Sequence, residues 1–431
     1  MATLGKLRLS DYVANLLSAR HRPNHSDAWN MRRAILRGKL MQQTKSQWPC
    51  FSEEEVQAVA GVIRSNKVNY WTGDTGRRFE TAFARWTGSN RAIALANGTL
   101  ALDVALKVLG IGPGDEVVVT PRTFIASVSS VVNSGATPVF ADVDRDSGNI
   151  SPETIAAVLT PRTRAIVPVH LAGWPCDMDG IMDMATTGNL AVIEDCAQAH
   201  GAKVGDRSVG SIGHVGAWSF CQDKIMTTGG EGGMVTTDDE DLWSRMWSFK
   251  DHGKSWDAVY NRHHAPGFRW VHDSFGTNWR MLEVQSVIGL IQLERMQEWT
   301  RRRTEIATTL YSALTPFASS VRAPLPRATD THAYYRFYAY VRPDGLRTGW
   351  DRDRLVAELN AGGVAVLHGT CPEVYLEHAF DTVSFRPKER LPVARELGET
   401  SLMFLTHPTM TDLEVSNTTE TIARVFGEAT R

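Results

Sequence analysis

A carboxylate and an amine stand beside two apolar runs in the middle of the chain. Asp195 closes the run at 190–193, and Lys224 follows the run at 215–220 and precedes the glycine cluster at 229–233. A carboxylate at a strand end can keep a pyridine nitrogen protonated, so that the ring absorbs electrons, and a lysine can hold an aldehyde as an imine and move protons. The pair predicts the chemistry of pyridoxal phosphate (PLP).

Each of these residues also has an ordinary structural interpretation. By position alone Lys224 is a surface lysine after a strand, and Asp195 is a helix cap. Gln198 follows Asp195 by three residues, so both side chains share a face if a helix begins there. The glycine-rich turn, and the expected ligand crevice at the carboxyl ends of parallel strands, favour the chemical role.

A second group of residues could hold a phosphate. Gly98 and Thr99 stand where an apolar run ends and a helix-period stretch begins. Glycine lets the backbone approach an anion, and the free amides of a helix start attract one. A plain turn with a threonine cap is the competing interpretation.

The elements that position these residues alternate along the chain. Seven short apolar runs are separated by turns and helix-period stretches, at 92–96, 116–120, 137–143, 164–169, 190–193, 215–220 and 233–237. This alternation is typical of an α/β fold with a mostly parallel, seven-stranded sheet covered on both faces. We expect an N-terminal extension over 1–50, a large α/β domain over 51–295 and a smaller α+β domain over 296–431.

Further patterns indicate individual elements. Ser52 with Glu55 is typical of a helix cap, a long helical pattern covers 280–312, and the run 334–341 reads as a strand of the small domain. Helices are expected at 352–360 and 414–425.

Composition excludes several classes of protein. The 431 residues are 42% hydrophobic and 22% charged with a net charge of −2, which gives no bulk attraction to nucleic acid or to an anionic membrane. The longest apolar runs are strand-sized, and the N-terminus lacks a secretion signal, so no membrane insertion is expected. Five scattered cysteines without metal-ligand spacing indicate reduced thiols in a cytoplasm and predict no metal site.

At this point the chain resembles the DegT/StrS family of nucleotide-sugar aminotransferases, fold type I enzymes of the aspartate aminotransferase superfamily. The similarity runs over roughly residues 52–425 and is carried by stretches in family order, at 97–102, 114–117, 120–124, 169–173, 194–198, 219–224 and 278–281. The resemblance implies a PLP-dependent aminotransferase with a large PLP domain and a small C-terminal domain.

The resemblance also assigns roles around the cofactor. It makes Lys224 the imine-forming lysine and Asp195 the partner of the pyridine nitrogen. The other implied cofactor-binding residues are Gly98, Thr99 and Ser219 near the phosphate, Phe124 stacked on the ring, and Gln198 near the ring hydroxyl.

Other implied roles lie further from the ring. Asn278 matches the residue that reaches the phosphate in the neighbouring subunit, which implies a homodimer with shared active sites. Arg280 could bind a carboxylate or a phosphate, or could form a structural salt bridge. Weaker candidates for the substrate site are Trp71, Tyr334, Arg336 and His368, whereas His170 reads as a core histidine.

The implied reaction moves an amino group from a donor, L-glutamate in the family, through the amine form of the cofactor (PMP) to a keto sugar. The acceptor would be a 3- or 4-keto-6-deoxy sugar on a nucleoside diphosphate, for a polysaccharide or a glycosylated metabolite. Because some relatives with histidine in place of the lysine are sugar dehydratases, Lys224 favours transamination. A PLP-dependent dehydratase, an aminocyclitol aminotransferase and a non-catalytic PLP-binding regulator remain alternatives.

Overall fold

The computed structural model describes residues 46–431. Most of the predicted N-terminal extension, residues 1–45, lies outside the described residues.

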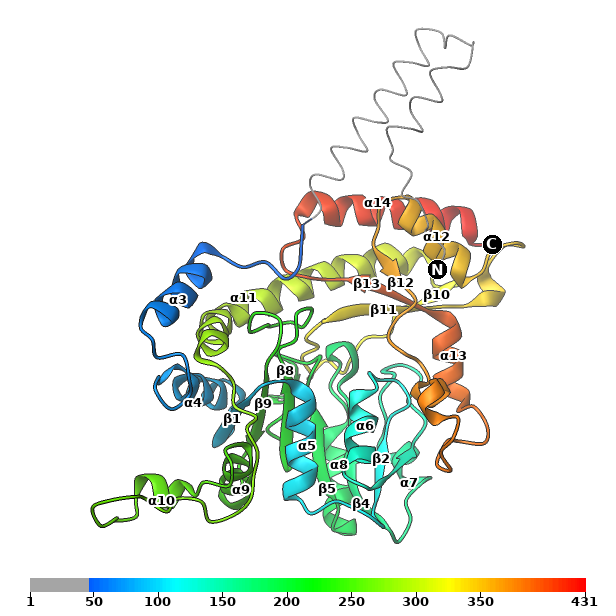
Figure 1. Cartoon of the computed structure of the whole chain (residues 1–431). Coiled ribbons are helices and arrows are strands. Elements are labelled where there is room, and N and C mark those ends of the chain that lie inside the picture. Colours follow the sequence, from blue (N-terminus) through cyan, green and yellow to red (C-terminus); the bar gives the residue numbers. More distant parts are fainter. Residues whose placement is uncertain (1–45) are drawn as a thin grey trace, which may run out of the picture. The chain divides into compact units, whose positions relative to one another are not determined.

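A seven-stranded sheet is the centre of the described chain (Figure 1). Its strands run in the order β1-β9-β8-β5-β4-β2-β3. The five strands from β8 to β3 are mutually parallel, whereas β9 is antiparallel to both of its neighbours, β8 and β1. The strands are β1 (Arg91–Leu95), β2 (Glu116–Val119), β3 (Thr137–Phe140), β4 (Thr163–Val167), β5 (Ala191–Asp195), β8 (Val215–Ser219) and β9 (Gly233–Thr237). The prediction of an α/β fold with a mostly parallel sheet is confirmed.

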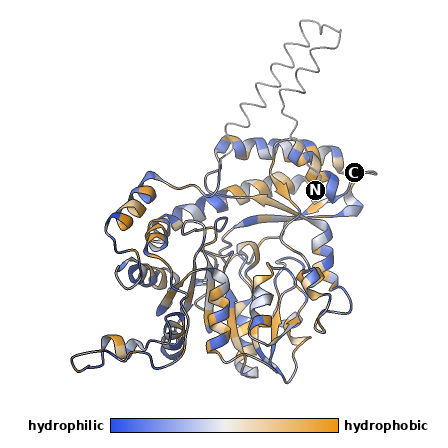
Figure 2. Cartoon of the chain, in the orientation of Figure 1, coloured by the Kyte–Doolittle hydropathy of each residue, from blue (hydrophilic) through white to orange (hydrophobic). Residues whose placement is uncertain are grey.

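Helices enclose this sheet. The first part of the described chain forms α3 (Glu53–Arg64), α4 (Thr75–Thr87), α5 (Gly98–Val108), α6 (Ala126–Asn133), α7 (Pro152–Ala156), α8 (Met178–Gly188), α9 (Glu240–Lys250) and α10 (Trp256–Tyr260). Along β2, Val117 and Val119 join one hydrophobic cluster while Val118 joins another, so both faces of the sheet are covered. Figure 2 shows the hydrophobic residues gathered along these strands.

A smaller antiparallel sheet lies in the C-terminal part, in the order β10-β11-β13-β12. Its strands are β10 (Val321–Arg322), β11 (Arg336–Val341), β12 (Val366–Leu367) and β13 (Ser401–Leu405), and its helices are α12 (Arg352–Ala361), α13 (Pro392–Thr400) and α14 (Asp412–Ala429). Of these, β11, α12 and α14 match the strand and the two helices expected there, whereas β10, β12, β13 and α13 are not predicted by the sequence.

One long helix, α11 (Glu283–Leu314), connects the two sheets. Leu293 and Met296 pack with the core near β8, and Ile306 and Leu310 pack with the core of the smaller sheet. The predicted domain boundary after residue 295 falls inside α11 and stays a prediction.

Within residues 46–431, no helix combines the length and the apolar character needed to cross a bilayer. The five cysteines are free thiols.

Candidate active site

A cavity of about 760 Å³ opens at the carboxyl ends of the central parallel strands. That volume is typical of small-molecule sites. Its walls come from the start of α5, the ends of β5 and β8, the loop before α6, and β11 of the smaller sheet. Of the residues predicted from the sequence, it is lined by Gly98, Thr99, Phe124, Asp195, Gln198, Ser219, Lys224 and Arg336.

Asp195 is the last residue of β5 and is only 6% exposed. Its Oδ2 accepts a hydrogen bond of 2.7 Å from the Ser127 hydroxyl, and its Oδ1 accepts one of 3.1 Å from the Ala197 amide. Thr123 in turn lies 2.8 Å from the Ser127 oxygen. Because Ser127 donates to Asp195, the Thr123 hydroxyl donates to Ser127, and this chain fixes the carboxylate at the cavity wall.

Lys224 does not belong to a strand but lies in the irregular loop between β8 and β9. Its side chain is 17% exposed, and its Nζ lies 3.8 Å from Asp223 Oδ1 and 5.4 Å from the centre of the Tyr335 ring. Burial alone would raise the pKa of Asp223, but Lys224, the Tyr335 hydroxyl and Arg336 outweigh burial and hold that pKa below its ordinary value. A charged carboxylate therefore stays beside the amine.

The start of α5 forms an anion-sized corner of the cavity. Asn97 caps the helix by accepting from the Leu100 amide, and the amides of Gly98 and Thr99 have no carbonyl one turn earlier to bond. A Cβ on Gly98 would lie 2.5 Å from the Ser219 Cβ, so only glycine allows this contact. The helix start and the Ser219 hydroxyl thus converge as an anion site requires.

Phe124 and Gln198 complete the walls. The Phe124 ring is 66% exposed although it lines the cavity, so a flat ligand could cover an apolar surface that now faces solvent. Gln198 accepts a hydrogen bond of 2.8 Å from the Ala172 amide. The expected helix after Asp195 is wrong: the chain makes a turn there, so tertiary contacts, and not helical spacing, bring Gln198 to the cavity.

Three predicted residues gather elsewhere, around the buried carboxylate of Asp251. This carboxylate accepts from Trp71 Nε1 at 2.8 Å, from Arg280 Nη1 at 2.7 Å and from Lys254 Nζ at 3.1 Å. Asn278 pairs with Asp251 through a backbone bridge and is exposed. Trp71, Asn278 and Arg280 therefore lie outside the cavity of their own chain, and Arg280 forms the structural salt bridge that the sequence left open.

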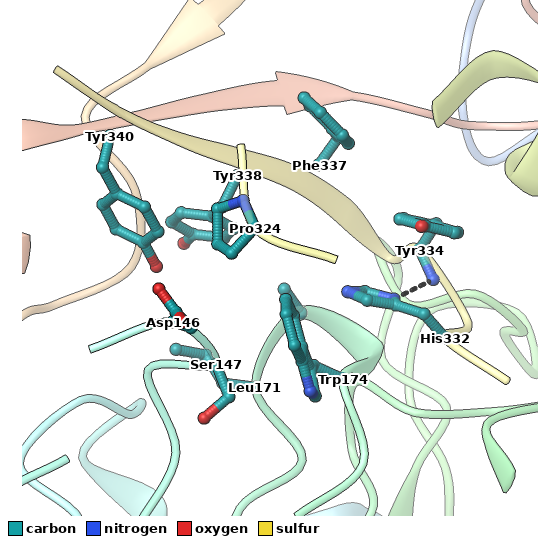
Figure 3. A pocket seen from close by; sticks show the side chains of 11 residues that line it. Asp146, Ser147, Leu171, Trp174, Pro324, His332, Tyr334, Phe337, Tyr338 and Tyr340 are labelled. Carbon is teal, nitrogen blue, oxygen red and sulfur yellow. Dashed lines mark hydrogen bonds between the residues drawn. The ribbon is translucent and has the colours of Figure 1, made fainter. Parts of the chain in front are cut away.

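The remaining substrate candidates separate from one another. Tyr334 faces a second cavity of about 20 Å³, where its amide donates to His332 Nδ1 and its ring stacks on His332 (Figure 3). Tyr338 of β11 lines both cavities. His368 is exposed, with Nε2 lying 3.4 Å from Asp353. Of the four weaker candidates, only Arg336 lines the large cavity.

His170 is a buried core histidine beside the site. Its Nε2 lies 3.0 Å from Glu194, and its Nδ1 accepts from the Cys176 amide. Glu194 also accepts from three backbone amides, those of Gly210, Ile212 and Gly213. His170, Glu194 and Cys196 are close enough to share a metal. However, the ring nitrogens of His170 and the carboxylate oxygens of Glu194 already make these hydrogen bonds within the protein.

Known proteins and a known family match most of this chain. The sequence pattern of the DegT/DnrJ/EryC1/StrS aminotransferase family matches residues 49–423. The chain is 37% identical over 359 residues to GDP-perosamine synthase from Caulobacter vibrioides, covering 83% of this chain and 92% of that protein. An aminotransferase from Psychrobacter cryohalolentis superposes with a TM-score of 0.87 at 61% identity, covering 89% of this chain and 99% of its own.

The chain belongs to the DegT/DnrJ/EryC1/StrS aminotransferase family. It is a PLP-dependent aminotransferase of fold type I. A second solved relative, S. venezuelae DesV in complex with a ketimine intermediate, is 31% identical with a TM-score of 0.76 and covers 86% of this chain and 94% of its own.

The cavity of this aminotransferase fits PLP at three separated points. Asp195 offers a fixed carboxylate to a ring nitrogen, the start of α5 with Ser219 offers donors to a phosphate, and Lys224 offers an amine to an aldehyde. Phe124 offers its exposed ring to the flat face of the cofactor. A carboxylate, an amine and an anion site therefore match the ring nitrogen, the aldehyde and the phosphate of PLP.

Sequence reasoning missed several residues of this site. Ser127 and Tyr335 carry the hydrogen bonds that hold Asp195 and Asp223, and Tyr338 forms part of the far wall. Ser127 lies four residues after Thr123 at the start of α6, which is the spacing at which two side chains meet. No comparable signal marks Tyr335, because its partner is distant in sequence.

Proposed function

We propose that this aminotransferase converts a keto sugar linked to a nucleoside diphosphate into an amino sugar, with L-glutamate as the amino donor. The acceptor is a 3- or 4-keto-6-deoxy sugar, and the product enters polysaccharide or glycosylated-metabolite synthesis. The observation that carries the proposal is the cavity that Asp195 and Lys224 line together.

The names of relatives support the sugar substrate. Two relatives are GDP-perosamine synthases, one from Caulobacter vibrioides and one from Escherichia coli O157:H7, and another is a spore coat polysaccharide biosynthesis protein from Bacillus subtilis. Identities of 35–37% over more than four fifths of this chain make a related acceptor the simplest expectation.

Asp195 has the role of holding a proton on the ring nitrogen. When bound, PLP supplies a ring that accepts the electron pair released at the substrate carbon. The Ser127 hydroxyl and the Ala197 amide keep the carboxylate in one orientation at the cavity wall, where it can accept the proton-bearing ring nitrogen as a partner.

Lys224 has the role of moving the proton that transamination requires. Its Nζ takes a proton from the donor carbon and later delivers one to the acceptor carbon, so it must reach both positions. Asp223 beside it stays ionised and stabilises the protonated amine in between. Gly98, Thr99 and Ser219 hold the phosphate, Gln198 lies near the ring hydroxyl, and Phe124 covers the ring.

We also propose a homodimer with shared active sites. Asn278 is exposed and lies outside the cavity of its own chain, so it is free to reach a second copy. The segment beside it exposes the large rings of Phe268, Trp270 and Phe275, the last of them 99% exposed. A second subunit would cover these rings. A monomeric mass in light scattering at micromolar concentration would contradict this.

Lys224→Ala tests the proposal directly. The purified wild-type protein is loaded with PLP, reduced with borohydride and digested, and the pyridoxyl mass should appear on the peptide that contains Lys224. Lys224→Ala should lose this label and at least about 10³-fold in turnover, because the amine proposed to move the proton is removed. The exposed Lys107→Ala on α5 is the matched control and should keep both.

The acceptor is tested with nucleotide-linked keto sugars and glutamate, with 2-oxoglutarate as the product measured. Release of 2-oxoglutarate with the keto sugar supports the proposal. Loss of water without 2-oxoglutarate would make the protein a dehydratase, and turnover of cyclitol ketones alone would make it an aminocyclitol aminotransferase. A bound cofactor that never reacts with glutamate would indicate a regulator.

A further inference from the structure

The loop that carries Lys224 has little secondary structure of its own. Between the end of β8 at Ser219 and the start of β9 at Gly233, the chain forms turns and one isolated bridge. A strand ladder therefore does not fix the backbone of Lys224. Within the loop the Lys224 amide donates to the Cys221 carbonyl at 3.1 Å, and further hydrogen bonds reach the loop from other parts of the chain.

The first of these bonds comes from Trp48. The indole Nε1 donates to the backbone carbonyl of Lys224 at 2.8 Å, across 176 positions of sequence. The Trp299 ring meets the indole edge-on with centroids 5.0 Å apart, and the Arg303 guanidinium lies 5.2 Å from the indole centre. Just before it, the Gln47 carbonyl accepts from the Thr409 hydroxyl.

The second bond reaches the same loop three residues later. The Thr227 amide donates to Gln292 Oε1 at 2.9 Å, and Gln292 Nε2 donates to Glu55 Oε1 at 2.8 Å. These three residues are buried. The other oxygen of Glu55 accepts from Ser52 and from Arg295 Nη1, so the carboxylate is fixed from several sides.

The charge of Glu55 strengthens this second link. Burial alone would raise the pKa of Glu55, but hydrogen bonds from Ser52 and Gln292 and the charge of Arg295 hold it below its ordinary value. Hydrogen bonds to an ionised group are the stronger kind. Ser52 and Glu55 read from sequence only as a helix cap, yet Glu55 also holds the side chain that binds the loop.

We propose that segment 48–55 positions the loop of Lys224, with Trp48 and Glu55 as positioning residues for the reaction. Trp48 acts on the lysine backbone and Glu55 acts through Gln292, and neither lines the cavity. The proposal rests on the role of Lys224 given above.

Trp48→Phe tests the proposal, because it removes the indole N–H and keeps an aromatic ring against Trp299. The matched control is Trp299→Phe, the same change in the other ring of the pair, which has no hydrogen bond to the loop among those between described residues. The affinity of each protein for PLP is measured by titration, together with the rate of borohydride labelling and the pH at which the absorbance of the bound cofactor changes.

Trp48→Phe should bind PLP about tenfold more weakly and label more slowly, the effect of one hydrogen bond. In Trp48→Phe the pH at which the absorbance of the bound cofactor changes should also move. Trp299→Phe should bind PLP within about twofold of wild type, and its absorbance should change at the wild-type pH. Equal values for the two variants would overturn the proposal. If Trp48→Phe does not fold, Trp48→His, which keeps a ring N–H, must retain wild-type affinity, and failure to do so also overturns it.

Lys224→Ala, run in parallel, keeps this test separate from the proposed function. Persistent labelling of Lys224→Ala would remove the assigned lysine whatever Trp48 does. Loss of that label, with Trp48→Phe indistinguishable from Trp299→Phe, would remove only the positioning role.

Discussion

The two ends of the cavity are built in different ways. At one end Asp195 terminates a buried strand, and its partners Ser127 and Ala197 lie on the adjoining helix and turn. At the other end Lys224 lies in a loop held by Trp48 and, through Thr227, by Gln292. In the mechanism proposed above, the charge that must stay in one place is attached to the sheet, whereas the base that must serve two carbons is attached to a loop.

Exchanging one carboxylate at each end of the cavity for an amide should have the largest effect of the changes considered. Asp195→Asn removes the charge at the fixed end and should lower turnover on the order of 10²–10³-fold, since losing one partner of a buried charge pair costs about 3–5 kcal/mol. Asp223→Asn at the loop end should cost less than about tenfold, because that side chain is half-exposed. Steady-state kinetics of both variants at saturating PLP measure the difference.

Equal losses of turnover in these two variants would contradict the conclusion that the two ends of the cavity are held differently. Far-ultraviolet circular dichroism and thermal melting of both proteins provide the folding control.

A buried histidine that packs against Trp218 and Phe220 should make the protein acid-sensitive. Burial first, and then the charges of Lys224 and Arg303, lower the pKa of His200 to about 3. His200 binds a proton near pH 6.5 in the unfolded chain but not in the folded chain. The stability that depends on neutral His200 is therefore fully present above pH 6.5 and is lost as pH falls toward 3. At pH 5 the loss should be about 2 kcal/mol of unfolding free energy.

Urea unfolding at pH 7 and pH 5 measures this loss. His200→Phe, which keeps a ring between Trp218 and Phe220, should show a pH dependence smaller by about 2 kcal/mol. His263→Phe at an exposed position is the control and should leave the dependence of the wild type. An unchanged slope in His200→Phe would disprove the assignment.

The smallest expected effect comes from the hydrogen bond that supports Asp195 at the sheet end of the cavity. Ser127→Ala removes one hydrogen bond to Asp195 and should weaken PLP binding by about 1 kcal/mol, or roughly fivefold. Ser129→Ala on the same helix is the control, since among the described residues its hydroxyl donates to a local carbonyl, that of Ala126. Titration of both apoproteins with PLP distinguishes them, and equal affinities would show that Ser127 does not matter.

Much of the fold and part of the site could be predicted from the sequence. The seven apolar runs became the seven strands of the main sheet, and Ser52 caps α3 as expected, because these features depend on neighbours in sequence. Gln198 lines the cavity because the chain turns after Asp195, and not because of the helical spacing that was expected. The group of Trp71, Asn278 and Arg280 could not be predicted, because a distant carboxylate, Asp251, gathers it.

The types and order of Asp195, Ser219 and Lys224 were enough to predict PLP-dependent transamination, and the family match confirms that class of enzyme. Only the tertiary structure decided how each is held. Strand ends converge by a local rule of parallel sheets, but hydrogen bonds such as that from Trp48 to Lys224 join residues whose separation along the chain carries no periodic signal.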